Sequence, residues 1–461
     1  MTATKFSVLL AAACVSLQGD PVQVRLLSPL ASYSPAGTKF EARVLGPVLH
    51  TAAPTIPAGT LIRGQVRTAN SVRFGIRHER ARLELSFLSC ERDGAAIPCD
   101  VKLLAVDNAR EAVKPNNRIQ GILAASHPHG WFNGIWFRPA RTLAQRSVGG
   151  FVGTAGLINT HLVPNPIGSG VLMASRFLLL RLPDPEIELP AGSEFVLEVE
   201  SDGHTVEQRV PEAESSAVTD WAASLPFEIT RPDGDAVQDV VNFVFTGSKD
   251  EIESAFQDSG WAPAEARSRK SIARTYGAFA RMHTNPTAPV SQLEYGGRPP
   301  DLVFQKSLNC ISKRHHIRLW QQELAGETVW IGAATHDTGI GFDVPRVRFT
   351  HRIDPEVDKE RSKILNDLTD AGCVSTAGAV KRPGLSERAA ASTDGDLYLI
   401  GLRSCISPRD GNPALERLQR RIVTKCARRV VLETRYYLTR GNVFYWAFRT
   451  ARWGVSSYAT N

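Results

Sequence analysis

A four-residue phrase that occurs three times constrains the first half of the chain most strongly. Pro35-Ala-Gly-Thr38, Pro57-Ala-Gly-Thr60 and Pro190-Ala-Gly-Ser193 each stand directly before a run of alternating apolar and polar residues. Proline and glycine favour a turn, and the alternation is what a half-buried strand requires. Residues 82–87 form another such run. We therefore expect residues 20–205 to form a mainly β module, either a barrel or a sandwich.

The composition is that of a soluble globular protein. A chain of 461 residues has room for about two to four domains. Its contents of 43% hydrophobic and 22% charged residues are ordinary and exclude a fibrous or disordered class. The net charge of +7 comes mostly from arginine, and no recognised nucleic-acid motif accompanies it. We interpret it as a basic surface and expect no nucleic-acid partner.

The N-terminus has the features of a secretory signal peptide. Lys5 precedes a short apolar run, residues 6–13, that ends in small residues and is too short to span a bilayer. We expect residues 1–19 to be removed during export to the periplasm or the cell exterior. Ala11-Ala-Ala-Cys14 also resembles a lipoprotein box, which makes Cys14 an alternative lipid anchor, and a buried N-terminal segment is the remaining interpretation. No other segment reaches spanning length, so the mature chain is expected to have no transmembrane helix.

Cysteine usage agrees with export. Without Cys14, six of the seven cysteines remain, which is an even number. Cys90 and Cys99 flank a predicted turn at Asp93-Gly94, and such a turn brings the two sulfurs close enough for a disulfide. The other four allow three pairings that the sequence leaves open, with free buried cysteines as the alternative: Cys310, Cys373, Cys405 and Cys426.

Strands alternate with capped helices in the second half of the chain. Residues 240–245 have the pattern of a strand, and Ser248-Lys-Asp-Glu251 is a capping box that opens a helix closed by Gly260. Later, residues 347–353 have the pattern of a strand and lead into a helix, with Asp354 as its cap and Pro355 as its first residue.

Two further alternating runs, residues 314–320 and 328–335, lie between these units. The pattern predicts an α+β module over residues 237–405, with helices packed on an antiparallel or mixed sheet. The acidic and polar stretch at 206–236 is expected to link it to the β module.

Five phrases of this module resemble the LssY C-terminal domain family. In chain order they are NFVFTGSKDEIESAFQDSGW, PTAPVSQLEYGGRPPDLVFQK, RHHIRLW, VWIGAATHD and FTHRIDPEVDKER, and the resemblance extends over about residues 240–405. It implies the α+β fold and a link to a secretion locus, but no activity is established for the family. Some members join this domain to membrane-lipid phosphatase-like segments, and this chain lacks that multi-pass part. In the first module, IPAGTLIRGQV followed by RARLELSF is similar to the β-barrel of TrbI-type envelope proteins.

Histidines and acids gather at strand ends between residues 314 and 360, which suggests a divalent metal site. Strand alternation places His315 on an apolar face, apart from His316, and gives His351 apolar neighbours as well. Asp354 and Asp358 are four residues apart and share one helix face. In a metal site, His315 or His316 with His351 and one of these acids would hold an ion such as zinc, and a second acid would activate water.

Two other interpretations of the same residues remain open. In a metal-free catalytic site, His351 would act as general base, Asp358 would orient it, and Arg361 would hold an anionic substrate. In a structural network, the histidines are satisfied core residues, Asp354 caps the helix, and Asp358 with Arg361 stabilises its first turn. The sequence contains no HExxH motif, nucleophile elbow, P-loop or GxGxxG motif, so it does not decide whether the protein is an enzyme.

Residues 406–461 are expected to form a basic helix followed by a terminal strand. Arginines crowd the helix beside an apolar stripe, so it would either contact anionic phospholipid headgroups or dock by that stripe. Together these features predict an exported bacterial envelope protein that binds or assembles with envelope proteins or an anionic lipid surface. The alternative is a metal-assisted hydrolase or lipid-modifying enzyme that uses the His/Asp residues.

Overall fold

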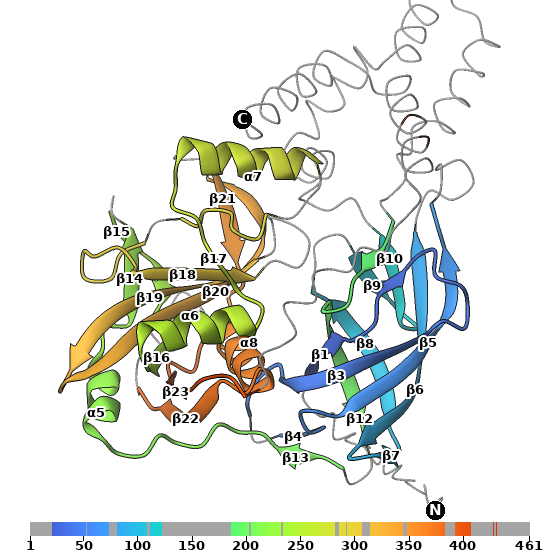
Figure 1. Cartoon of the computed structure of the whole chain (residues 1–461), viewed down its shortest axis with the longest axis horizontal. Coiled ribbons are helices and arrows are strands. Elements are labelled where there is room, and N and C mark those ends of the chain that lie inside the picture. Colours follow the sequence, from blue (N-terminus) through green and yellow to red (C-terminus); the bar gives the residue numbers. More distant parts are fainter. Residues whose placement is uncertain are drawn as a thin grey trace, which may run out of the picture.

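The computed structural model describes two β-rich modules that lie side by side (Figure 1). The described residues are 21–51, 53–72, 81–107, 111–121, 186–201, 204–231, 234–281, 285–291, 293–306, 314–343, 348–382 and 392–406, with 427 and 430. The expected signal peptide, Cys14 and most of the expected tail, residues 406–461, lie outside them.

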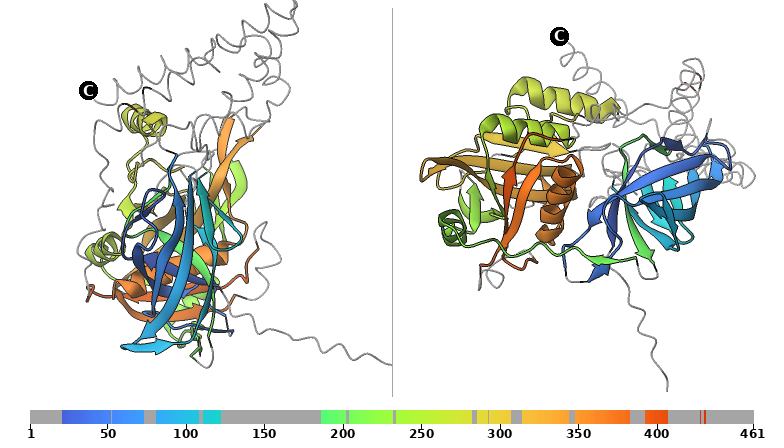
Figure 2. Two further views of the ribbon diagram at one scale, coloured as in Figure 1. Left: turned by 90° about the vertical axis from the view of Figure 1, so that its right-hand side faces the viewer. Right: turned by 60° about the horizontal axis from the view of Figure 1, so that its bottom comes forward.

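The first module is a nearly closed barrel-like sheet, which confirms the expected β module. Its nine strands are β1 (Val22–Leu26), β3 (Lys39–Pro47), β5 (Leu61–Asn70), β6 (Arg82–Arg92), β7 (Ala95–Ile97), β8 (Asp100–Val106), β9 (Glu111–Lys114), β10 (Arg118–Gly121) and β12 (Glu194–Glu200). They pair in the order β8-β12-β1-β3-β5-β6-β10-β9, and β7 pairs with β6. The two ends of this path, β8 and β9, follow one another in the chain, and the sheet curls on itself (Figure 2).

Two short strand pairs border this barrel. One pair is β2 (Leu30–Ala31) with β11 (Glu188–Leu189), and the other is β4 (Pro54–Thr55) with β13 (Val206–Glu207). The buried apolar residues of the barrel form one core, in which most of the side chains from the alternating strands are valine, leucine, isoleucine and phenylalanine.

The three Pro-Ala-Gly turns are built alike, as the repeated phrase predicts. The backbone φ is 84° at Gly37, 86° at Gly59 and 89° at Gly192, a left-handed conformation that favours glycine. In the second turn the Gly59 N–H donates to the Val44 carbonyl at 2.8 Å, and the Val44 N–H donates back to the Thr60 carbonyl at 2.9 Å. The other two turns repeat this reciprocal pair, so each turn is fastened to a neighbouring strand.

Replacing Gly59 with alanine is expected to lower the free energy of unfolding by about 1–2 kcal/mol, because an L-residue is disfavoured in the left-handed region. A Cβ added to Gly59 would meet no atom within 4 Å, so the variant reports the backbone conformation alone. Urea unfolding of the wild type and the variant measures the difference. An unchanged unfolding midpoint would contradict the left-handed turn.

The hairpin disulfide predicted from the sequence is confirmed. Cys90 and Cys99 are bonded, with their Cα atoms 6.1 Å apart. Asp93 and Gly94 form the turn between β6 and β7 with φ of 51° and 81°, both positive as a type I′ hairpin turn requires.

The second module is built on an eight-stranded mixed sheet, which confirms the expected α+β class. Its strands are β16 (Phe243–Thr246), β17 (Ala262–Pro263), β18 (Leu302–Lys306), β19 (Arg314–Leu324), β20 (Glu327–Asp343), β21 (Arg348–Ile353), β22 (Val374–Val380) and β23 (Leu397–Leu402). The order is β17-β18-β19-β20-β16-β23-β22, with β21 paired to β20. Strands β16 and β23 run parallel, and the other pairs are antiparallel.

Helices cover both faces of this sheet. They are α5 (Ala217–Ser224), α6 (Lys249–Asp258), α7 (Arg269–Arg281) and α8 (Val357–Asp370). On one face, Phe256 of α6 and Leu368 of α8 share a core with Phe245. On the other face, Ala222 of α5 shares a core with Val244. Among the described helices, none is both long and apolar enough to cross a bilayer.

Regular structure also occupies the segment expected to act as a linker, residues 206–236. It holds α5, the strand β14 (Glu228–Arg231) and the start of β15 (Gly234–Val240), which pairs with β14. Leu225 and Ile229 from this segment are buried in the same core as Ala222. The few apolar residues of this segment therefore pack against the sheet, although the composition of the segment is polar.

The helices α6 and α8 of the second module begin in different ways. The capping box at the start of α6 is confirmed, with Ser248 and Glu251 bonded to each other's backbone N–H. For α8, the expected start at Asp354 and Pro355 is wrong, because the helix begins at Val357. Before it, Glu356 forms a β-bridge with Ser392, and the Asp354 carboxylate accepts the Glu356 N–H at 3.0 Å.

Candidate functional site

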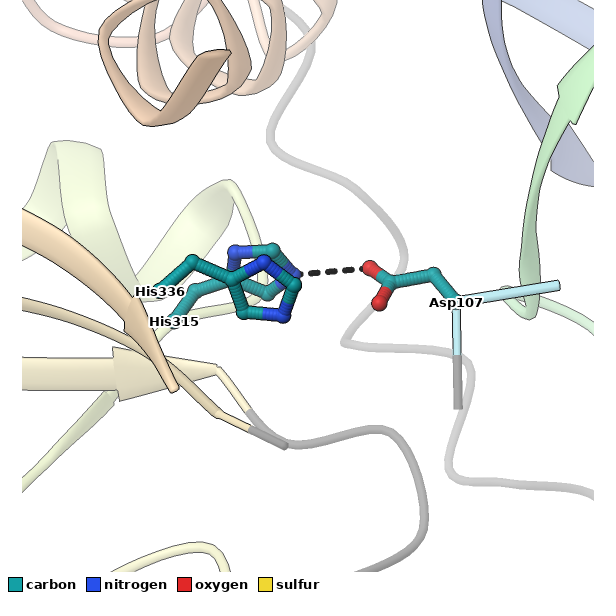
Figure 3. A group of neighbouring side chains, drawn as sticks. All are labelled: Asp107, His315 and His336. Atoms are coloured by element: carbon teal, nitrogen blue, oxygen red, sulfur yellow. Dashed lines mark hydrogen bonds and ion pairs between the residues drawn. The ribbon is translucent and has the colours of Figure 1, made fainter. Parts of the chain in front are cut away.

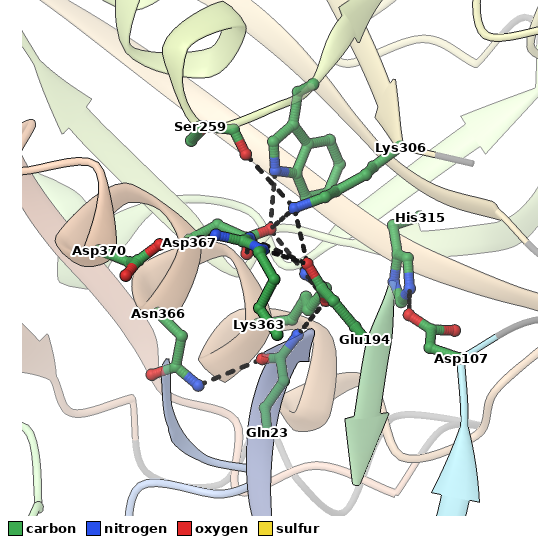
Figure 4. Close-up of polar contacts among 12 residues, drawn as sticks. Gln23, Asp107, Glu194, Ser259, Lys306, His315, Lys363, Asn366, Asp367 and Asp370 are labelled. Atoms are coloured by element: carbon green, nitrogen blue, oxygen red, sulfur yellow. Dashed lines mark hydrogen bonds and ion pairs between the residues drawn. The ribbon is translucent and has the colours of Figure 1, made fainter. Parts of the chain in front are cut away.

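Buried charged side chains join the two modules (Figure 4). The barrel contributes Arg25 from β1 and Glu194 from β12, which lie directly opposite each other in the sheet. The second module contributes Lys306 from the end of β18, with Lys363 and Asp367 from α8. All five are at most 6% exposed. We call these five residues the junction cluster.

Asp367 is the hub of the junction cluster. One carboxylate oxygen, Oδ1, accepts from Arg25 Nη2 at 2.8 Å. The other, Oδ2, accepts from Lys306 Nζ at 2.8 Å, from Lys363 Nζ at 2.7 Å and from the Trp261 indole at 3.0 Å. Burial alone would raise the pKa of the Asp367 carboxyl, but the two lysines and Arg25 hold it below its usual range. The carboxylate is therefore charged in the folded protein.

Glu194 is the counterpart of Asp367 on the barrel. It lies 2.9 Å from Arg25 Nη2, 3.1 Å from Lys306 Nζ and 2.7 Å from Lys363 Nζ. Burial would raise the pKa of the Glu194 carboxyl, but these cations lower it well below its ordinary value. Each of the three cations therefore contacts both carboxylates. The charged groups of the barrel are thus partly neutralised by those of the second module, and the reverse also holds.

A second group at the same junction centres on His315 (Figure 3). Asp107 directly follows the barrel strand β8, and His315 and His336 lie opposite each other on β19 and β20. Asp107 Oδ2 is 2.7 Å from Nε2 of His315, and Glu360 Oε2 is 2.6 Å from its Nδ1. The two imidazole rings stack with their centroids 4.1 Å apart.

His315 is held as an imidazolium in this arrangement. Burial alone would lower the pKa of His315, but Glu360 and Asp107 raise it to about 10. Burial would likewise raise the pKa of Asp107, and His315 holds it well below its usual range. The residues Asp107, His315 and His336, which we call the histidine cluster, each offer one metal-ligating atom within 4.8 Å of the other two. Their donor set suits an ion pair or a borderline divalent metal.

The structure separates the residues that the sequence suggests as metal ligands. His315 belongs to the histidine cluster, whereas His316 points to the opposite face of β19 and bonds Thr335 Oγ1 through Nε2 at 2.9 Å. Asp354 donates its backbone N–H to the His336 carbonyl at 2.8 Å, while its carboxylate accepts within its own turn. His351 lies on β21, and its side chain is outside the described residues.

Two of the suggested catalytic residues lie together in a third group. Arg361 is bonded to both oxygens of Asp394, at 2.9 and 2.6 Å, and its guanidinium lies 4.5 Å from the centroid of the Tyr398 ring. Asp358 lies 3.6 Å from Arg361 and accepts from Thr393 Oγ1 at 2.7 Å. Burial raises the pKa of the Asp358 carboxyl. These contacts tie the first turns of α8 to the segment before β23.

Sequence reasoning missed Asp107 and Glu360 and left His336 out of the suggested ligands. The sequence could have identified His336. If residues 325–326 are taken as a two-residue hairpin turn, the antiparallel register places His336 opposite His315. No sequence signal points to Asp107, because it belongs to the other module and lies 208 residues from His315 in the chain. Glu360 lies next to Arg361 on the helix, and only the packing of α8 shows that it faces His315.

The structure therefore combines a nearly closed barrel-like sheet with an α+β domain, and buried ion pairs join the two. Residues 223–401 match the family model described as LssY C-terminus. The α+β module therefore belongs to the LssY C-terminal domain family, which confirms the resemblance seen in its motifs. We call it the LssY domain.

Other comparisons add little. The search of curated proteins finds no match. Among solved structures, ComB10 of the Com Type IV secretion system of Helicobacter pylori matches with 14% sequence identity, 39% of this chain and 85% of that chain covered, and a TM-score of 0.19. A TM-score this low carries no argument about fold or partners.

Proposed function

We propose that this protein works outside the cytoplasm as a binding and assembly component of the cell envelope. The observation that carries the location is a disulfide in each module, Cys90–Cys99 in the barrel and Cys373–Cys405 in the LssY domain. Disulfides persist in oxidising compartments and are rare in the cytosol. The proposed location is the periplasm or the cell exterior, with residues 1–19 removed or Cys14 serving as lipid anchor.

The proposed binding role rests on the way in which the two modules are joined. The junction cluster places cations and carboxylates from both modules out of water, and separating them would leave buried groups unpaired on each side. The barrel and the LssY domain would therefore present one continuous surface to a partner. Envelope proteins and anionic lipid headgroups are the proposed partners, and the basic tail at 406–461 is the part proposed to contact lipid.

The alternative function is a metal-assisted hydrolase or lipid-modifying enzyme, and the convergence of the histidine cluster favours it. Less support comes from the suggested catalytic groups. Asp358 and Arg361 use their polar atoms on Thr393 and Asp394, which favours a structural role. We therefore place the binding role first.

The thiol state of the exported protein tests the proposed location. We expect Cys90, Cys99, Cys373 and Cys405 to resist alkylation in cells and to react with a maleimide only after reduction. Matched double variants, Cys90→Ser with Cys99→Ser and Cys373→Ser with Cys405→Ser, should each lose two labelled positions. Free thiols on a cytoplasmic protein with an intact N-terminus would refute the proposal. Flotation with anionic and with neutral vesicles separates a lipid partner from a protein partner.

A further inference from the structure

We propose that Asp107, His315 and His336 bind a divalent transition metal of the zinc class, which ties the barrel to the LssY domain. One carboxylate oxygen and two imidazole nitrogens converge here, each within 4.8 Å of the other two. Zinc takes such a set of three protein ligands and leaves a fourth position for water or another ligand. The ligands come from both modules, because Asp107 follows β8 and the histidines lie on β19 and β20.

Glu360 gives His315 the orientation of a metal ligand. A metal-bound histidine usually donates its second ring N–H to a carboxylate, which fixes its tautomer and its direction. Glu360, 2% exposed on α8, lies 2.6 Å from His315 Nδ1 and fills that position. The other nitrogen, Nε2, faces Asp107 at 2.7 Å. The metal would take the place of the proton that Nε2 and Asp107 now share.

The charge of this group also favours a cation. Asp107 and Glu360 place two carboxyl groups against the His315 ring, at 2.7 and 2.6 Å from its two nitrogens. Within the part of the chain that the structure describes, Glu360 Oε1 is buried without a hydrogen-bond partner. A buried carboxylate that is incompletely compensated is costly. A divalent cation bound here would be attracted by both carboxyl groups.

The geometry requires the ligand atoms to move in two ways, because one pair is too close for a shared metal and the His336 ring is stacked on that of His315. Ligand atoms in a tetrahedral zinc site lie about 3.4 Å apart, as follows from zinc–nitrogen bonds of about 2.0–2.1 Å. The ligand atoms of Asp107 and His315 are closer than this, at 2.7 Å, and would have to separate, whereas the group as a whole spans up to 4.8 Å. His336 is only partly buried, whereas His315 is fixed by Glu360, so rotation of the His336 ring is the movement that would close the site.

Metal titration of the full chain tests this inference, and its result does not depend on the proposed envelope location. We expect the metal-free wild type to bind one equivalent of zinc by calorimetry, and cobalt to give the visible absorption of a tetrahedral site. His336→Phe keeps a ring stacked on His315 but removes both nitrogens, and Asp107→Asn keeps an acceptor but removes the charge. Each should weaken binding by about 100-fold or more, and Glu360→Gln by roughly 10–100-fold.

His204→Gln is the matched control, because it removes an exposed histidine far from the cluster in sequence and should leave zinc affinity unchanged. Circular dichroism shows whether each variant is folded. If Asp107→Asn does not fold, the zinc affinity of His336→Phe decides the test. Zinc should raise the melting temperature of the wild type and leave that of His336→Phe unchanged. Absence of zinc binding by the wild type, or equal affinity in the wild type and His336→Phe, would overturn the inference.

Discussion

Replacing Asp367 with asparagine is expected to lower the free energy of unfolding by about 3–5 kcal/mol, the usual loss when one partner of a buried ion pair is removed. The variant leaves Lys306 and Lys363 buried with the carboxylate of Glu194 alone, while Arg25 keeps Glu194 and Asp370. An amide also offers one acceptor oxygen where two oxygens now receive four donors. Urea unfolding followed by circular dichroism measures the loss.

Asp93→Asn is the matched control for this change. The Asp93 side chain is 90% exposed, and its ion pair with Arg92 lies at the surface of a turn that also accepts asparagine. We expect a change of less than about 0.5 kcal/mol in this variant. A loss in Asp367→Asn as small as that in Asp93→Asn would show that the junction cluster does not hold the modules together.

The cost of Asp367→Asn is also expected to depend on pH. The pKa of Asp367 is held below its usual range, so the stabilisation from this carboxylate is fully present above the ordinary aspartate pKa of about 3.9. It is lost as the pH falls through the lower pKa of the folded state. The gap between wild type and variant should therefore narrow when urea unfolding is repeated at about pH 3. A difference in unfolding free energy between wild type and variant that stays constant with pH would contradict a charged Asp367 carboxylate in the folded protein.

Removing the disulfide of the LssY domain is expected to have the second large effect. For a closed loop the chain-entropy model gives a loss of about 3.7 kcal/mol for Cys373–Cys405 and about 2.6 kcal/mol for Cys90–Cys99. The difference arises because the first bond spans 32 residues and the second spans 9. Cys373 is fully buried, so its replacement by alanine also removes core packing.

Double alanine variants of each pair, compared with the wild type by urea unfolding, measure these losses. Reduction of the wild type by dithiothreitol removes both bonds without changing any side chain, which separates the loss of the crosslink from the loss of packing. A larger loss for Cys90–Cys99 than for Cys373–Cys405 would contradict the loop-length argument.

Local features of this fold could be predicted from the sequence, because their causes are local. The three Pro-Ala-Gly turns, the Asp93-Gly94 hairpin and the capping box at Ser248 each follow from the conformation or hydrogen bonding of a few neighbouring residues. Strand alternation likewise places His315 and His316 on opposite faces of β19. Such signals identify elements and faces, and leave open which elements meet.

The junction could not be predicted, because its residues have the sequence pattern of a solvated surface. Lys363 and Asp367 have the four-residue spacing of an exposed helical ion pair, and Glu194 begins an ordinary alternating strand. Charged residues of this kind are almost never fully buried unless they are paired. Only the docking of α8 on the barrel buries them, and that contact joins positions more than 300 residues apart, as for Arg25 and Asp367.

The position of β12 in the chain sets an order of assembly. Arg25 stands on the first barrel strand and Glu194 on the last, and the two come together only when β12 pairs with β1. The surface that receives α8 therefore does not exist while the barrel is open. Because β12 precedes α8 in the chain, the barrel can close during synthesis before the helix emerges. We therefore expect the LssY domain to dock only after β12 has paired with β1.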